Sequence, residues 1–498
     1  MDTLQFIAAG FSAALTPTNL AFALVGCILG TLIGVLPGLG PAAGTAILIP
    51  LTFKLDPTGA IIMLSAIYYG AMYGGTITSV LINVPGEAAS VITCIDGYEM
   101  AKKGRAGTAL GIAAIGSFIG GIFAATALVV VATPLSRLAL SFGPPEFFAL
   151  LLVGLCLVTS LAGRSLVAGV LMTVVGLLIA MIGIDPVRGA PRFTFGMPDL
   201  YDGVGFIPVV MGLFGIGEIL ITAESPARQV LKTKLTGLLP SREEWRRSLG
   251  AIARGTGIGF FLGLIPGVGS IIPTFMAYVL EKRLSKTPEQ FGQGAIEGVA
   301  APETANNAYA NAAMVPLLTL GIPSSPTIAV LMGAFIINGL TPGPFLFQER
   351  PDLVWAVIAS FFIGNVLLLV LNLPLVGLWA KILEVPYHYI CVGTLLFCVL
   401  GAYSINQSVF DIWVMLGFGV VGYLLRKIDF PIAPAVLGLI LGPMLEKSLR
   451  TSLEMSAGDF SIFLTRPISA GLLVIAGIIL VVSALRLAPA QVRESNAD

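Results

Sequence analysis

Apolar residues run through this chain in long stretches, separated by short polar segments. A helix needs about 20 apolar residues to cross the roughly 30 Å apolar core of a bilayer. Stretches of that kind recur along the chain, for example Thr108–Ala132, Leu166–Ile184, Val204–Ile221, Val354–Trp379 and Ile468–Leu485. The pattern predicts an all-α polytopic membrane protein with about 10–12 transmembrane helices.

The composition agrees with a lipid environment. Of the 498 residues, 56% are hydrophobic and 11% are charged, whereas soluble domains carry about 25% charged residues. Basic and acidic residues balance at 27 each, so nothing suggests a nucleic acid partner. With one histidine and no G-x-x-x-x-G-K-[ST] phosphate loop, we expect neither an enzyme nor an ATP-driven pump. No cofactor is expected apart from a coupling ion.

Two apolar runs contain a proline between glycines in matching patterns, "GVLPGLGP" at 34–41 and "GLIPGVGS" at 263–270. Proline stops a helix, and the glycines allow close backbone approach. The freed N–H and C=O groups are tolerated in lipid only where protein or a watery cavity covers them. A helix that starts after such a break directs free N–H groups into the cavity, which suits an anion. Packing kinks are the alternative, but two matched breaks favour function.

A second pair of matching segments predicts an internal duplication. "NVPGEAASVIT" aligns with "GIPSSPTIAVL", so that Pro85 matches Pro323, and "IDG" (95–97) aligns with "ING" (337–339). We therefore predict a membrane repeat at 1–223, a basic linker at 224–250, a second membrane repeat at 251–466, and a C-terminal transmembrane helix with a short tail at 467–498.

Basic loops predict the orientation of the copies. The segments 99–107, 224–249, 281–286 and 424–429 are basic and are expected in the cytoplasm, with 183–203 on the opposite side. "FKLDP" carries no net charge, whereas its counterpart "EKRLSK" is basic, so the positive side changes between the copies. We predict two inverted-topology repeats with re-entrant hairpins and broken helices, and a cytoplasmic linker and C-terminus.

Polar residues inside apolar spans are costly and usually face a cavity. Glu303, Asn307 and Asn311 follow one another at helical spacing on one face, and amide, hydroxyl and carbonyl oxygens are hard ligands of the kind that Na⁺ takes. Hydrogen bonding between helices is the alternative, and Glu303 could instead carry a proton. The predicted substrate-binding residues are Gly38, Gly40, Pro85, Gly86, Glu87, Ser90, Gly267, Gly269, Ser324 and Ser325. The predicted ion-coupling residues, a possible Na⁺ site, are Thr76, Asn83, Glu303, Asn306, Asn307 and Asn311.

The same stretches resemble a known family. "GVLPGLGP", "NVPGEAASVITCIDGYEMAKKG" and "APETANNAYANAAMVPLLTLGIPSSPTIAVLMGAFIINGLTPGP" are similar to the signature segments of the large membrane subunit of tripartite tricarboxylate transporters, the TctA family. Ser324 stands where the family pattern has glycine, and Thr304 where it has alanine. Both positions lie beside the expected site, and the family takes several di- and tricarboxylates, so the carboxylate stays open.

The resemblance implies a multi-pass permease subunit of the bacterial inner membrane. It implies three kinds of partner: a small TctB-like membrane subunit, a periplasmic TctC-like solute-binding protein, and an organic carboxylate as substrate. Uptake would be secondary transport driven by a Na⁺ or H⁺ gradient, through alternating access around a midplane site between the repeats. Two other classes also use such breaks: the ion-translocating subunit of a membrane decarboxylase, and an anion channel.

Overall fold

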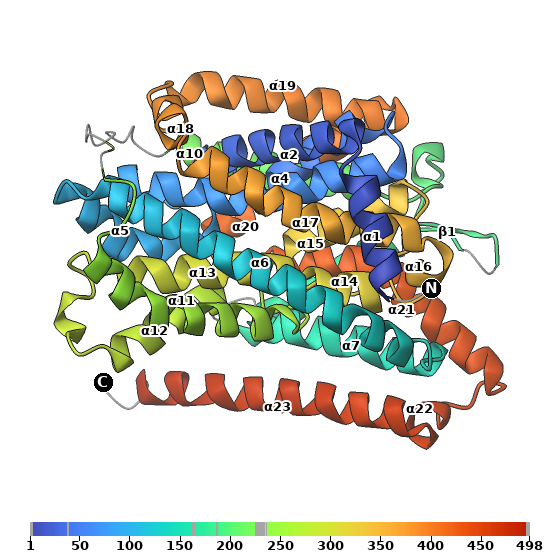
Figure 1. Ribbon diagram of the computed structural model, residues 1–498. Coiled ribbons are helices and arrows are strands. Elements are labelled where there is room, and N and C mark those ends of the chain that lie inside the picture. The colour runs from blue at the N-terminus through green and yellow to red at the C-terminus, as the bar shows by residue number, and fades with distance from the viewer. Residues whose placement is uncertain are drawn as a thin grey trace.

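Helices account for most of the computed structural model (Figure 1). The structure describes residues 3–36, 39–161, 165–185, 188–224, 235 and 237–494. The first half contains α1 (Thr3–Ala14), α2 (Pro17–Val35), α3 (Gly40–Leu48), η1 (Ile49–Thr52), α4 (Pro57–Ile82), η2 (Ala88–Val91), α5 (Thr93–Lys102), α6 (Ala106–Ala139), α7 (Pro144–Leu161), α8 (Leu166–Ala180), β1 (Gly183–Ile184), β2 (Pro191–Arg192), η3 (Pro198–Leu200), α9 (Phe206–Val210), the π-helical turn η4 (Met211–Ile216) and α10 (Gly217–Ala223).

The second half contains α11 (Arg242–Gly263), α12 (Ile271–Leu284), η5 (Pro288–Gln290), α13 (Glu297–Ala312), α14 (Met314–Leu320), α15 (Pro326–Ile337), α16 (Leu346–Glu349), α17 (Pro351–Asn372), α18 (Val376–Ile382), α19 (Tyr387–Asn406), α20 (Val409–Lys427), α21 (Ala433–Met455), α22 (Ile462–Thr465) and α23 (Pro467–Glu494). Within the described ranges, eight helices are long and apolar enough to cross a membrane. The chain is therefore an all-α polytopic membrane protein.

Local sequence signals explain several helix ends. Asp56 caps α4, and its carboxylate accepts a hydrogen bond from the Gly59 N–H at 3.0 Å. Ser241 and Glu244 form a reciprocal capping box that starts α11 at Arg242, so this helix takes in the last part of the predicted linker. The remainder of that linker lies mostly outside the described residues.

Two of the predicted apolar stretches are not single helices. Within Val354–Trp379, α17 ends at Asn372 and α18 begins at Val376, because Pro374 lies between them and cannot continue a helix. Within Leu166–Ile184, α8 ends at Ala180, and Gly183 and Ile184 pair as an antiparallel strand with Pro191 and Arg192. Apolar composition alone does not separate a helix from the short strand that follows it.

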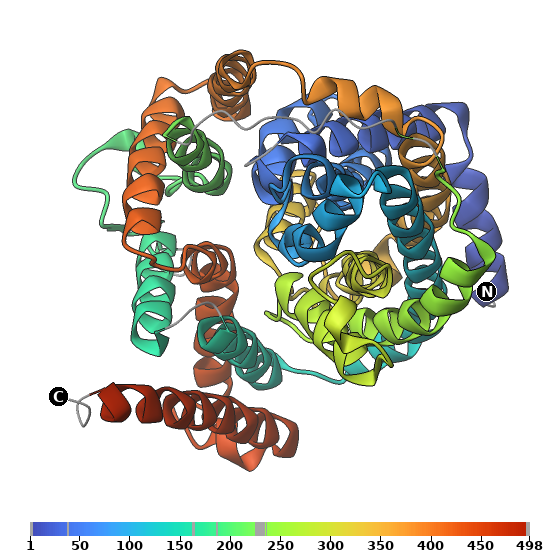
Figure 2. The ribbon, with the colours of Figure 1, turned by 90° about the vertical axis from the view of Figure 1, so that its left-hand side faces the viewer.

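The helices form two groups, which Figure 2 shows end-on. The core group consists of α1–α6 and α11–α18, and the flanking group consists of α7–α10 and α19–α23. Each half of the chain contributes first to the core group and then to the flanking group. Contacts between the groups involve the short helices α3 and α15, which touch α9, and α15 also touches α21.

Helices at corresponding places in the two predicted copies make corresponding contacts. α2 packs on α4 as α11 packs on α13, and α6 packs on α13 as α17 packs on α4. In the flanking group, α8 packs on α21 as α20 packs on α10. A duplication would produce such a contact pattern, but the duplication, its boundaries and the inverted orientation of the copies all stay predictions.

The basic segments gather at one end of the molecule. Arg105 of the segment 99–107 forms an ion pair with Glu244 of the segment 224–249 at 2.6 Å. Lys427 of the segment 424–429 forms an ion pair with Glu224, so these contacts join three of the basic segments. Figure 1 shows α5, the start of α11 and the end of α12 together at the left, with β1 and β2 at the right. Three of the basic segments therefore lie at the opposite end of the molecule from the 183–203 segment, while the side of the membrane that each occupies stays a prediction.

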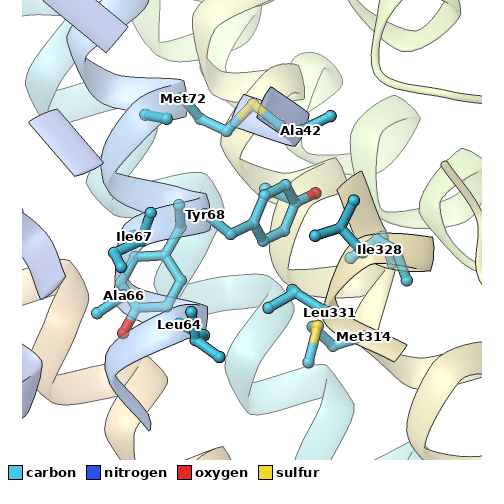
Figure 3. Packing of buried hydrophobic residues seen from close by; sticks show 14 of the residues in the cluster. Ala42, Leu64, Ala66, Ile67, Tyr68, Met72, Met314, Ile328 and Leu331 are labelled. Atoms are coloured by element: carbon cyan, nitrogen blue, oxygen red, sulfur yellow. The ribbon is translucent and has the colours of Figure 1, made fainter. Parts of the chain in front are cut away.

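Buried apolar contacts with α4 position the short helices α3 and α15. Figure 3 shows Tyr68 of α4 pointing toward Ile328 and Leu331 of α15, and Met72 of α4 beside Ala42 of α3. Tyr68, Ile328 and Leu331 are almost completely buried. Because α3, α4 and α15 pack on one another, the N-termini of α3 and α15 are held in place.

Candidate functional site

The predicted breaks of both halves meet at one cavity of about 570 Å³. This volume is in the usual range for a small-molecule site. One wall of the cavity is formed by the core group, through four segments around the breaks: 39–43, 85–88, 267–272 and 325–327. The flanking group provides the facing wall through Val158, Phe214, Glu218, Arg426, Ala433 and Leu437.

The helices are interrupted at each of these places. α11 ends at Gly263 and α12 begins at Ile271, so Pro266 lies between helices. α2 ends at Val35 and α3 begins at Gly40, although Pro37 and Gly38 themselves lie outside the described residues. Gly321 caps the C-terminus of α14 in the left-handed conformation, and Asn83 caps the C-terminus of α4 in the same conformation. The interruptions thus expose backbone ends beside the cavity.

Two features favour glycine at position 267: the backbone conformation and the closeness of Val158. Its φ of +82° favours glycine, and an added Cβ would lie 2.6 Å from Val158 Cγ2 and 2.8 Å from Val158 N. The core group therefore approaches α7 of the flanking group closely at this break. Gly40 and Gly269 also have positive φ, but a Cβ there would meet no atom within 4 Å.

Seven of the ten predicted substrate-binding residues line the cavity: Gly40, Pro85, Gly86, Glu87, Gly267, Gly269 and Ser325. Ser90 and Ser324 are fully buried away from it. The Ser90 hydroxyl donates to the Glu87 carbonyl at 2.9 Å, and the Ser324 carbonyl accepts from the Gly269 N–H at 3.2 Å. These two serines therefore support the lining loops and are not part of the wall. The tenth, Gly38, lies outside the described residues.

Three helix N-termini border the cavity. The lining segments contain the first residues of α3, α12 and α15. Neither α3 nor α12 has a side-chain cap, and Ser325 caps α15 by accepting the Ile328 N–H at 3.3 Å. The first N–H groups of a helix have no partner inside that helix, and the helix dipole is positive there. The core wall therefore presents the first turns of three helices to the cavity, beside the Glu87 carboxylate.

The Glu303 carboxylate joins three helices in a buried cluster. Its Oε2 accepts a hydrogen bond from the Thr76 hydroxyl of α4 at 2.5 Å, and its Oε1 accepts one from the Thr93 hydroxyl of α5 at 2.5 Å. Thr76 was predicted with Glu303, whereas Thr93 was not. A buried carboxylate needs such donors or a counter-charge.

Asn306 connects this cluster to the cavity. Its amide nitrogen donates to Glu87 Oε1 at 2.5 Å, and Glu87 lines the cavity. The Asn306 Oδ1 and Asn307 Oδ1 atoms are buried and have no hydrogen-bond partner among the described residues. Amide oxygens of this kind are among the ligands that hard cations take, so the two unused acceptors on α13 are candidates for such a role. No group of three or more histidine, cysteine, aspartate or glutamate side chains that could hold a metal occurs in the described part of the chain.

Asn307 and Asn311 also bond to neighbouring helices, as the alternative interpretation expected. The Asn307 amide donates to Ser117 Oγ of α6 at 2.7 Å, and Asn365 of α17 donates to Asn311 Oδ1 at 3.5 Å. Asn83 is apart from this set, because it is exposed at the left-handed end of α4 while the other five predicted residues are buried. A left-handed cap position explains an asparagine without an ion.

Sequence reasoning missed the flanking wall. Glu218 and Arg426 lie in or beside apolar spans and form an ion pair across α10 and α20. Charged residues inside apolar spans were the signal that could have identified them. In the sequence Arg426 belongs to a basic segment, and its pairing with Glu218 is not apparent because α10 and α20 are far apart along the chain.

Comparison with known proteins shows which family the chain belongs to. A family model described as "Tripartite tricarboxylate transporter TctA family" matches residues 20–437. An Agrobacterium vitis relative described as "Uncharacterized 52.8 kDa protein in TAR-I ttuC' 3'region" is 48% identical over 486 residues, which is 97% of each chain. Another from that organism, "Uncharacterized protein in TAR-II ttuC' 3'region", is 48% identical over 227 residues, which is 46% of this chain and 93% of the relative. No solved structure matches. The family match spans the breaks of both halves, and the chain belongs to the tripartite tricarboxylate transporter TctA family.

Proposed function

We propose that this chain is the large permease subunit of a binding-protein-dependent secondary transporter that takes up di- or tricarboxylates or related organic acids. The observation that carries the proposal is that the N-termini of α3, α12 and α15 border one cavity. Free N–H groups and positive dipole ends bind carboxylates without a metal or a cofactor. Broken helices from two repeats commonly form such sites in secondary transporters.

The coupling ion, Na⁺ or H⁺, would act at the buried cluster behind the cavity. Glu87 lines the cavity and is bonded to Asn306, whose Oδ1 is free for a cation. A carboxylate in the wall repels an anionic substrate unless its charge is neutralised. Binding of Na⁺ beside Glu87 and Glu303, or of a proton on one of them, would remove this repulsion. Ion and substrate binding would then favour each other.

Alternating access would move the core and flanking groups relative to each other around the cavity. Each group provides one wall, so a relative movement changes which end of the cavity is open. We place the protein in a bacterial inner membrane, with the basic segments, the 224–250 linker and the C-terminus in the cytoplasm. A small TctB-like membrane subunit and a periplasmic TctC-like binding protein would complete the transporter.

Reconstituted uptake tests this function. The chain, the small subunit and the binding protein are combined with liposomes, and labelled carboxylates are supplied under an imposed Na⁺ or H⁺ gradient. We expect saturable uptake that requires both the binding protein and the gradient. Continuous conductance without the binding protein would instead indicate an anion channel, and ion movement coupled to decarboxylation would indicate a decarboxylase subunit.

A variant of Glu87 tests the coupling. In Glu87→Gln the repulsion is gone, so uptake should persist but lose most of its dependence on the gradient. Glu99→Gln is the matched control, because Glu99 is bonded to Lys102 on the surface of α5. Unchanged gradient dependence in Glu87→Gln would contradict this role for Glu87.

A further inference from the structure

The wall that the flanking group provides contains a positively charged side chain. Arg426 is the one basic side chain among the described residues that line the cavity, and its side chain is 25% exposed. It lies in the last turn of α20, in the flanking group, whereas the helix N-termini belong to the core group. The two anion-attracting features therefore face each other across the cavity.

Neighbouring groups position the Arg426 guanidinium. It forms an ion pair with Glu218 of α10, and its Nη2 donates to the Leu213 carbonyl at 3.4 Å. The guanidinium also lies over the Phe214 ring, 6.0 Å from the ring centroid. Glu218 and Phe214 line the same cavity, so this pair is at the surface that a substrate would touch.

Lys427, the next residue of α20, differs from Arg426 in its position and exposure. Lys427 pairs with Glu224, and both side chains are about half exposed, 45% and 48% respectively. Neither Lys427 nor Glu224 lines the cavity. Adjacent positions on α20 thus carry one cation inside the cavity and one outside it.

We infer that Arg426 binds the second carboxylate of a substrate whose first carboxylate is bound at the helix N-termini. This inference rests on the proposed function. Glu218 holds the guanidinium when the cavity has no anion, and the substrate carboxylate replaces Glu218 on binding. Arginine suits this exchange, because its planar guanidinium offers five donors and binds carboxylates in a bidentate manner.

A consequence is selectivity for substrates with two or more carboxylates. Such a substrate contacts the core group at one end and the flanking group at the other, so it connects the two groups. A monocarboxylate can satisfy only one wall. Arg426 is therefore the specificity-determining residue of the cavity, and Glu218 competes with the substrate for it.

Three variants in the full reconstituted transporter test this inference: Arg426→Gln, Arg426→Lys and Glu218→Gln. Lys427→Gln is the matched control. Uptake is measured for labelled mono-, di- and tricarboxylates of three to six carbons. Arg426→Gln should raise KM for di- and tricarboxylates about 30-fold or more, with monocarboxylate KM changed less than about 3-fold. Arg426→Lys should lie between Arg426→Gln and the wild type, since it keeps the charge but not the bidentate geometry.

Glu218→Gln separates binding from a structural role. Removing the competing carboxylate should lower KM for dicarboxylates several-fold, whereas loss of a purely structural ion pair would impair all substrates alike. Equal effects on mono- and dicarboxylates in Arg426→Gln and Glu218→Gln, or effects matched by Lys427→Gln, would overturn the inference. If the wild type takes up no carboxylate, the proposed function itself fails. If the wild type takes up carboxylates but Arg426→Gln leaves the selectivity unchanged, the proposed function stands and this inference is wrong.

Discussion

The close approach between the break at Gly267 and α7 gives a prediction with a built-in control. Gly267→Ala places a methyl group 2.6 Å from Val158 Cγ2 and 2.8 Å from Val158 N. The left-handed backbone costs a non-glycine residue about 1–2 kcal/mol. Overpacking of this kind adds about 1–3 kcal/mol. We therefore expect the free energy of unfolding to fall by about 2–5 kcal/mol.

Gly269→Ala is the matched variant in the same loop. Its φ of +71° gives a similar backbone cost, but its new methyl group meets no atom within 4 Å. We expect a loss of only about 1–2 kcal/mol. The difference between the two variants isolates the contact with α7, which joins the core and flanking groups.

The assay is unfolding of the purified protein by titration of a denaturing detergent into mixed micelles. Val158→Ala in the Gly267→Ala background should recover about 1 kcal/mol, because it removes Cγ2 while the backbone nitrogen remains. Equal losses for Gly267→Ala and Gly269→Ala, or no coupling between positions 158 and 267, would refute the close approach.

Three other outcomes are expected. Asn307→Ala should abolish uptake in membrane vesicles while the protein stays in the membrane, because it removes the unused buried acceptor and the hydrogen bond to Ser117. Uptake at the wild-type rate would show that Asn307 is not part of the site. Lys286→Cys, at an exposed position, should react with an impermeant maleimide only from the cytoplasm, and labelling solely from outside would overturn the topology. Arg254→Ala should lower the free energy of unfolding by about 1–3 kcal/mol, because it removes the guanidinium that donates to both Glu281 carboxylate oxygens, at 2.5 and 2.7 Å. An unchanged unfolding curve would show that the pair contributes no stability.

Much of the site could be predicted from local sequence rules. Proline disfavours the interior of a helix, and each of the breaks near Gly40, Pro85, Gly267 and Ser325 has a proline within two residues or at the position itself. Each of these positions lines the cavity. Helical spacing likewise brought Glu303, Asn307 and Asn311 onto one helix, which is α13.

Local rules failed where a residue's role depends on what packs against it. Ser90 and Ser324 have the chemistry of ligands, but both face the interior and support the loops. Asn83 resembles the other amides in type, yet it ends a helix in the left-handed conformation. Composition cannot distinguish these environments, because burial is a property of the folded neighbours.

Hydropathy and the backbone limits of proline and glycine act over a few residues, so sequence alone predicts a membrane protein, its main helices and the breaks at the cavity, although not the break at Pro374. Helix packing brings the breaks of both halves to one cavity and makes Glu218 and Arg426, 208 positions apart, part of its opposite wall. No local rule predicts this arrangement, because it depends on where groups from distant segments converge in space. That convergence comes from the packing of helices across the two groups, which no short stretch of sequence encodes.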